Sequence, residues 1–216
     1  MRLFTQNIRI WLGENIKVEI TASLVKELRE KTGLGMMECK KALTETSGDL
    51  AKAVDHLRKR GALKAEGKSD RITSEGVISS YIHMGGKVGV LLEINCETDF
   101  VARSEDFTSL VKDVAMHITA AKPTYVKRED VPQDYLDKEK EIILAQSGDD
   151  LNNKPENIRE KILTGRIDKI YNQVCLLEQP FVKNPDITVN DLVKEKIAKL
   201  GENITIKRFT RYVLGE

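Results

Sequence analysis

The chain has 216 residues, of which 40% are hydrophobic and 32% are charged, a composition typical of a folded globular protein with one or two domains. Its 35 lysines and arginines nearly balance its 34 aspartates and glutamates, so the net charge of +1 creates no strong field for holding nucleic-acid phosphates. The composition therefore argues against nucleic acid as a principal ligand.

A membrane span needs roughly 18 consecutive apolar residues. The longest apolar run here, 88–92, includes a glycine and stops at Glu93. The three cysteines, Cys39, Cys96 and Cys175, are far apart and never form the Cys-x-x-Cys spacing of a zinc or redox centre. We therefore expect no membrane span, no bound metal, no cofactor and a reducing compartment such as the cytoplasm.

Residues 1–17 differ from the rest of the chain because they carry Arg2, Arg9 and Lys17 but a single acid, Glu14. One interpretation of residues 1–18 is a poorly ordered extension or an upstream start codon. The alternative is an organellar transit peptide, because such segments are basic and poor in acids, and it would place the protein in an organelle matrix.

Three short helices are expected between residues 21 and 61. Thr21 suits the N-cap of the first, and Asp49 suits that of the third. Glycines at 33, 35, 48 and 61 break or end the helices. The inner faces are formed by Leu24, Val25, Leu28, Met36, Cys39, Leu43, Leu50, Ala53, Val54 and Leu57. Residues 19–61 are thus predicted to form a three-helix module, followed by a linker or weak helical extension at 62–75.

The hydrophobic period changes to two between residues 88 and 96, which predicts a strand. A turn at 84–87 would join it to a strand at about 76–83 as an antiparallel hairpin. A strongly amphipathic helix is expected from Phe107 to the residues before Pro123.

Later elements are expected in the order helix, helix, strand, helix, strand. Their approximate ranges are 132–146, 155–174, 175–181, 189–200 and 203–214, with a bulge in the last strand near Lys207. The predicted fold class is α+β. The helical N-terminal module precedes a core domain, 76–216, with an antiparallel sheet packed by helices.

The sequence contains few patterns typical of catalysis. It lacks the phosphate-binding glycine loop, the Gly-x-Ser-x-Gly elbow and the His-Glu-x-x-His pair. A Cys96 nucleophile served by His83 from the paired strand is geometrically conceivable. Cys96 lies on the apolar register of its strand, however, and this favours a small buried hydrophobe.

The segment Thr98–Val101 is the most informative for function, because a hydrophobic strand delivers Asp99 and Phe100 into a connecting loop. On spacing alone, Asp99 would cap the following turn and Phe100 would pack on Phe107. The alternative is that Phe100 protrudes as an anchor for a partner.

Several longer segments resemble a known family. They are 20–33 (ITASLVKELREKTG), 35–43 (GMMECKKAL), 93–101 (EINCETDFV), Met116–His117 and 179–182 (QPFV). Together they closely resemble bacterial elongation factor Ts over about residues 19–216. That family is the guanine-nucleotide exchange factor for elongation factor Tu, and its N-terminal module is similar to ubiquitin-associated domains.

The resemblance implies that the protein binds elongation factor Tu carrying GDP and accelerates GDP release without breaking a bond. It does so by displacing contacts on the magnesium and phosphate side, which allows GTP to load. Carried over by position, the displacing segment is Thr98, Asp99, Phe100 and Val101. The other partner-binding positions are Arg29, Met36, Met37 and His117.

The helical pattern leaves alternatives open at these other positions. It favours a core place for Met36, and it makes Met37 the better candidate for a soft contact with the partner. Arg29 is either such a contact or a solvated helix charge. His117 is either exposed to a partner at the edge of its stripe or a satisfied, half-buried histidine.

The resemblance is to the short form of the family, since the second half-core repeat and the coiled-coil insertion of longer members have no counterpart after Thr98–Val101. Short members compensate by pairing two chains, so we expect a homodimer. A different class of function is an adaptor that tethers its partner without changing GDP release.

Overall fold

The computed structural model describes residues 19–152 and 154–216, so the expectation for residues 1–18 lies outside the described residues. The chain divides after Gly61 into two compact units. Each unit is described by itself.

The first unit contains α2 (Ala22–Thr32), α3 (Met36–Glu45) and most of α4 (Leu50–Glu66). Thr21 caps α2, because its hydroxyl oxygen accepts from the Leu24 N–H at 3.3 Å. Asp49 caps α4 by accepting from the Lys52 N–H at 3.0 Å. The buried cluster of this unit consists of Val25, Leu28, Cys39, Ala42, Leu43, Ala53 and Leu57.

The sequence pattern predicted that the third helix ends at Gly61, but α4 continues to Glu66. The residues after Gly61 include two alanines and a leucine, which favour helix. Ala65 is buried in the core of the second unit. The helical-extension alternative therefore holds for residues 62–66, and residues 67–74 lead to the first strand.

The second unit is built on a three-stranded antiparallel sheet in the order β1 (Glu75–Ile82), β2 (Val88–Cys96), β5 (Ile204–Val213). The predicted hairpin of β1 and β2 is present. On the other side of β2, Glu93 pairs with Arg208 and Ile94 pairs with Ile206. Lys207 is therefore the extra residue of a β-bulge, where the sequence predicted one.

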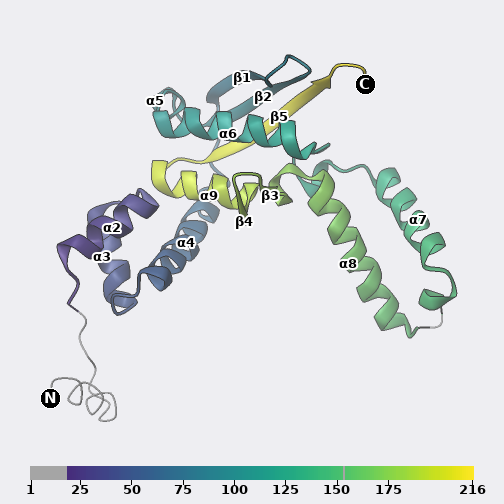
Figure 1. The fold of residues 1–216 in the computed structure, drawn as a ribbon, viewed down its shortest axis with the longest axis horizontal. Coiled ribbons are helices and arrows are strands. Elements are labelled where there is room, and N and C mark those ends of the chain that lie inside the picture. Colours follow the sequence, from purple (N-terminus) through teal and green to yellow (C-terminus); the bar gives the residue numbers. More distant parts are fainter. Residues whose placement is uncertain (1–18, 153) are drawn as a thin grey trace, which may run out of the picture. The chain divides into compact units, whose positions relative to one another are not determined.

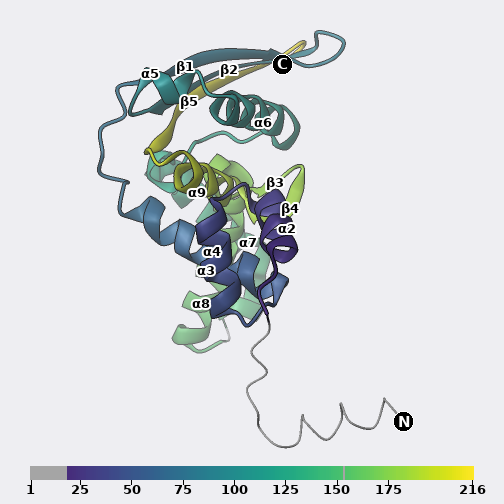
Figure 2. The ribbon, with the colours of Figure 1, turned by 90° about the vertical axis from the view of Figure 1, so that its left-hand side faces the viewer.

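Helices α6 (Glu105–Ala121) and α9 (Val189–Leu200) complete the core of this unit. Figure 2 shows α6 running below the sheet, and both helices contribute to one buried cluster. The sheet contributes Val90, Leu92, Ile94 and Cys96 to it, and α6 contributes Phe107, Leu110, Val114 and Ile118. This is the predicted α+β class, with an antiparallel sheet packed by helices.

Between α6 and α9 the chain forms a helical hairpin of α7 (Gln133–Asn152) and α8 (Glu156–Val174), visible in Figure 1. The first helix continues past the predicted end at 146. The 3-10 helix η1 (Arg128–Asp130) lies at the base of the hairpin. There the Arg128 guanidinium binds Asp168 and Glu178 and stacks over the Tyr171 ring.

The predicted strand at 175–181 is mostly wrong. Cys175 makes a single bridge with Tyr125, and the 3-10 helix η2 (Leu176–Glu178) follows. Only β3 (Pro180–Phe181) is strand, and it pairs with β4 (Asn184–Thr188), which the pattern did not predict. Among the described residues, none of the helices combines the length and the hydrophobicity that a membrane span requires.

Candidate functional site

The segment singled out by the sequence forms a short helix, α5 (Asp99–Ala102), immediately after β2. We call residues 98–103 the α5 turn. Thr98 is its N-cap, and its hydroxyl oxygen accepts from the Val101 N–H at 3.4 Å. Ala102 is buried and Val101 packs against the core, so one side of this turn is fixed to the second unit.

Phe100 points away from that fixed side, since 83% of the residue is exposed. Phe107 is fully buried in the core cluster. The expectation that Phe100 packs on Phe107 is therefore wrong. Asp99 does not cap the turn, because Thr98 does so, and its carboxylate instead pairs with Arg103 at 2.9 Å. The alternative expectation, that the Phe100 side chain protrudes from the turn, agrees with its exposure.

Two carboxylates that the sequence reasoning missed hold the start of this turn. Glu202 accepts from the Thr98 N–H at 3.0 Å and from the Thr98 hydroxyl at 2.6 Å. Glu97 accepts a hydrogen bond from the Asn203 N–H at 2.6 Å. This hydrogen bond lowers the pKa of Glu97 below its usual value, and the nearby Arg71 guanidinium lowers it further by a smaller amount. More than 100 residues separate these partners, so no local pattern could have shown the link.

The candidate residues of the N-terminal unit lie on two helices. Arg29 is exposed in the last turn of α2. Met37 is 78% exposed, and Met36 is 43% exposed and absent from the buried cluster of its unit. The prediction that Met36 belongs to the core is wrong, because it is the first residue of α3 and no earlier helical turn covers it.

His117 is fully buried, so the expectation of an exposed boundary position is wrong. Its Nδ1 accepts from the Val182 N–H at 3.2 Å, which leaves Nε2 as the protonated nitrogen that donates to the Gln179 side-chain oxygen at 2.9 Å. Burial lowers the pKa of His117. Because its Nδ1 accepts a hydrogen bond, the ring is neutral, and its two hydrogen bonds fix the 179–182 segment, where Val182 is exposed.

The cysteine–histidine pair considered for catalysis does not form. His83 lies at the turn end of the hairpin, opposite Val88, whereas Cys96 pairs with Glu75 at the far end. Eight residues at about 3.3 Å each separate these ends by roughly 26 Å. Burial, reinforced by the nearby Glu202 carboxylate, raises the pKa of the Cys96 thiol to about 11. The nucleophile hypothesis is therefore wrong.

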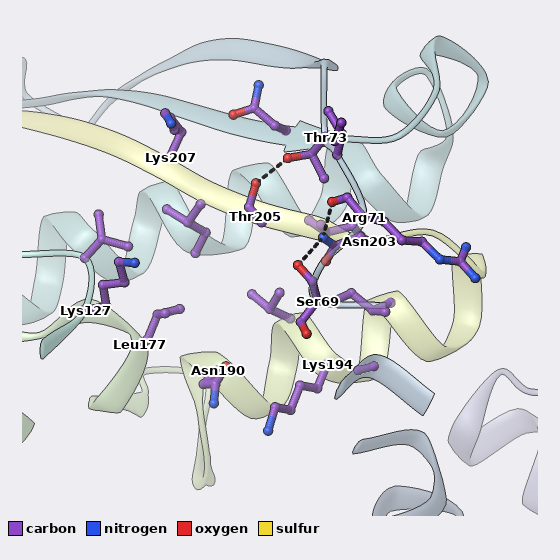
Figure 3. A pocket seen from close by; sticks show the side chains of 18 of the residues that line it. Ser69, Arg71, Thr73, Lys127, Leu177, Asn190, Lys194, Asn203, Thr205 and Lys207 are labelled. Atoms are coloured by element: carbon purple, nitrogen blue, oxygen red, sulfur yellow. Dashed lines mark hydrogen bonds between the residues drawn. The ribbon is translucent and has the colours of Figure 1, made fainter. Parts of the chain in front are cut away.

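An open cavity of about 970 Å³ lies in the second unit, lined by β5, α9 and residues 65–74. Figure 3 shows Asn203 in this cavity, with its side-chain amide donating to the carbonyl oxygens of Ser69 and Arg71. The Thr73 and Thr205 hydroxyls are 2.9 Å apart. These polar groups fasten the 69–73 segment to the start of β5. Across the described residues, no cluster of three or more metal-binding side chains is found.

Comparison with known proteins gives a consistent result. The sequence profile of the family described as "Elongation factor TS" matches residues 15–216. Elongation factor Ts of Alkaliphilus oremlandii is 59% identical over 199 residues, which cover 92% of this chain and 91% of that protein. Elongation factor Ts of Carboxydothermus hydrogenoformans is 58% identical over 197 residues, with 91% and 90% covered. Elongation factor Ts of Moorella thermoacetica is 56% identical over 197 residues, which cover 91% of this chain and 96% of that protein.

The second unit has an α+β fold, and its α5 turn exposes an aromatic side chain. A profile match over most of the chain, together with relatives above 50% identity, shows the family. The chain belongs to the elongation factor Ts family and is a translation elongation factor.

Proposed function

We propose that this protein binds elongation factor Tu in its GDP-bound state and accelerates release of the GDP, so that GTP can load. The observation that carries the proposal is the exposure of Phe100 on a turn that is otherwise fixed to the core. The resemblance to elongation factor Ts supports this choice of partner.

Exchange of this kind requires no bond chemistry. A factor that binds the empty partner more tightly than the loaded one must weaken GDP binding by the same ratio, because the two affinities are linked thermodynamically. In this proposal Asp99 and Phe100 enter the partner and displace contacts on the magnesium and phosphate side of GDP. Phe100 gains burial there, which contributes roughly 2 kcal/mol or more when an aromatic anchor fills a pocket.

We further propose that the N-terminal unit, residues 19–61, is a separate docking module similar to a ubiquitin-associated domain. Met37 and Arg29 are its candidate contacts, and the exposed part of Met36 is available to the same partner. His117 acts indirectly in this proposal, by holding the 179–182 segment. The proposed compartment is the cytoplasm, and the organelle matrix is the alternative if residues 1–17 act as a transit peptide.

The deciding experiment is a stopped-flow measurement of labelled GDP leaving elongation factor Tu. We expect the release rate to rise with factor concentration and to reach a plateau, while GTP and GDP remain unhydrolysed. Binding that leaves the release rate unchanged at saturation would support the adaptor function instead.

A further inference from the structure

The start of the α5 turn lies against the corner that joins α9 to β5, residues 201–203. We infer that Glu202 of this corner is a positioning residue for exchange, because it holds Thr98 and thereby presents Phe100 to the partner. This inference rests on the proposed function and adds a residue that acts through Phe100.

The α5 turn cannot hold its own shape. It contains a single helical turn of four residues, and an isolated turn of that length is unstable in water. Phe100 is exposed and gives the turn no internal packing. The ion pair of Asp99 with Arg103 is also exposed, and such pairs contribute little. The orientation of the turn therefore depends on what holds its two ends.

At the C-terminal end the anchors are apolar, since Ala102 is buried and Val101 packs against the core. At the N-terminal end the anchors are polar. Glu202 binds the Thr98 N–H and hydroxyl with its two carboxylate oxygens, and the Cys96 thiol donates to the Thr98 carbonyl at 3.1 Å. Phe100 lies between the two ends. Losing either anchor would free the residue to sample other directions.

The hydrogen bonds of Thr98 explain why a carboxylate is suited to position 202. A threonine hydroxyl has one proton to donate and two lone pairs to accept with. The Thr98 hydroxyl donates its hydrogen bond to Glu202, so the lone pairs of the hydroxyl oxygen remain available to accept from the Val101 N–H at 3.4 Å. Glu202 thereby completes the N-cap of α5.

The corner itself is held from several directions. Glu97, next to Thr98, accepts a hydrogen bond from the Asn203 N–H of the corner, and Glu202 of the corner accepts one from the Thr98 N–H. The two carboxylates therefore link the corner to the start of the α5 turn from both sides. The Asn203 side chain binds the carbonyl oxygens of Ser69 and Arg71 (Figure 3). Glu202 therefore extends from a rigid base, as a positioning residue must.

The test compares Glu202→Ala and Glu202→Gln with the unaltered protein in the GDP-release assay. If positioning is lost, the turn occupies its binding-competent direction for a smaller fraction of the time, and apparent affinity falls by that fraction. For Glu202→Ala we expect the half-saturating factor concentration to rise about tenfold, since hydrogen bonds to a charged group contribute a factor of this size. The maximal release rate is expected to change little.

Glu202→Gln keeps the shape of the side chain and one acceptor oxygen, so it provides a folded variant even if the alanine variant unfolds. Its half-saturating concentration is expected to lie between those of the other two proteins. Glu66→Gln is the matched control, because it makes the same change of side chain in the same unit. The Glu66 carboxylate pairs with Lys194 and not with a residue of the α5 turn. We expect this control to behave like the unaltered protein.

A second comparison repeats Glu202→Ala in a Phe100→Ala background. If Glu202 acts through Phe100, it has no further effect there, whereas a loss of general stability would lower activity in both backgrounds. An unchanged half-saturating concentration for Glu202→Ala, or equal losses in both backgrounds, would overturn the inference while leaving the proposed function intact. If Phe100→Ala accelerates GDP release as well as the unaltered protein does, the anchor role of Phe100 fails and the inference about Glu202 fails with it, while exchange itself stands.

Discussion

Phe100 and Phe107 are seven residues apart and have opposite environments. Phe107 lies on the inner stripe of α6 and is fully buried, whereas Phe100 lies on α5 and is 83% exposed. Periodicity predicted the buried residue, because a 17-residue helix has a clear inner face. A helix of four residues has no such pattern, so the environment of Phe100 was not predictable from spacing.

Replacing these two phenylalanines should separate function from stability. Phe100→Ala should lower the GDP-release activity at least tenfold, since truncating an interface hot spot costs about 2 kcal/mol or more. Its melting temperature should stay close to that of the unaltered protein, because no internal cavity forms. Phe107→Ala, the control, should lose about 3–5 kcal/mol of unfolding free energy. A large fall in the melting temperature of Phe100→Ala would contradict the anchor assignment.

His117 and Met36 show the limit of sequence reasoning at this scale. The helical wheel places a residue on a face, but it does not say what other segments cover that face. His117 lies off the centre of its stripe, and it is buried because the distant 179–182 segment binds both ring nitrogens. The wheel places Met36 on the same side as Cys39 and Leu43, but Met36 is 43% exposed and does not belong to the buried cluster of its unit.

At the scale of elements, the best-predicted ones are those with a complete local pattern. The ranges expected for β2 and α9 agree with the structure, and both elements show a regular alternation or stripe over their whole length. Elements held by distant hydrogen bonds were missed. In η2, Leu176 and Leu177 donate their N–H groups to the carbonyls of Tyr125 and Val126, and no feature of 175–181 itself indicates this.

The β1–β2 hairpin depends on a glycine that no other residue can replace without strain. Gly76 has φ of 141°, and a Cβ there would lie 2.2 Å from the Ile94 carbonyl oxygen. Gly76→Ala should therefore lower the unfolding free energy by about 3 kcal/mol or more, since backbone atoms of a paired strand cannot move aside. Urea denaturation measures the change.

Gly165→Ala is the control for that substitution. Gly165 lies inside α8, and a Cβ at this position meets no atom within 4 Å. Alanine should raise the unfolding free energy by about 0.5–1 kcal/mol, because glycine is the poorer helix former. Equal stability of the two alanine variants would show that the close approach at Gly76 is not a real constraint.

For the whole molecule, the main open surface of the sheet lies opposite α6. Side chains alternate along each strand, and those pointing away from the core include four large apolar or aromatic ones that are half or more exposed. They are Ile78, Ile82, Leu91 and Tyr212. A face of this kind is commonly buried by a second copy in a two-fold dimer.

We propose that two chains pair through this sheet face. Sedimentation equilibrium under reducing conditions should then give about twice the 24.4 kDa mass of one chain at micromolar concentration. Leu91→Glu should shift the mass toward one chain, because a charge would be buried at the centre of the contact. Ile72→Glu, which changes an exposed isoleucine outside the sheet, should leave the mass unchanged. A single-chain mass for the unaltered protein would overturn the dimer.

Each of the three buried clusters of the described chain contains one of the three cysteines. Cys39 belongs to the N-terminal cluster, Cys96 to the cluster under the sheet and Cys175 to the small cluster at the base of the helical hairpin. All three thiols are free and buried, so a thiol reagent reaches each one only when its own surroundings open. The native protein therefore carries three built-in reporters, and the labelling rate at each thiol measures how often that region opens.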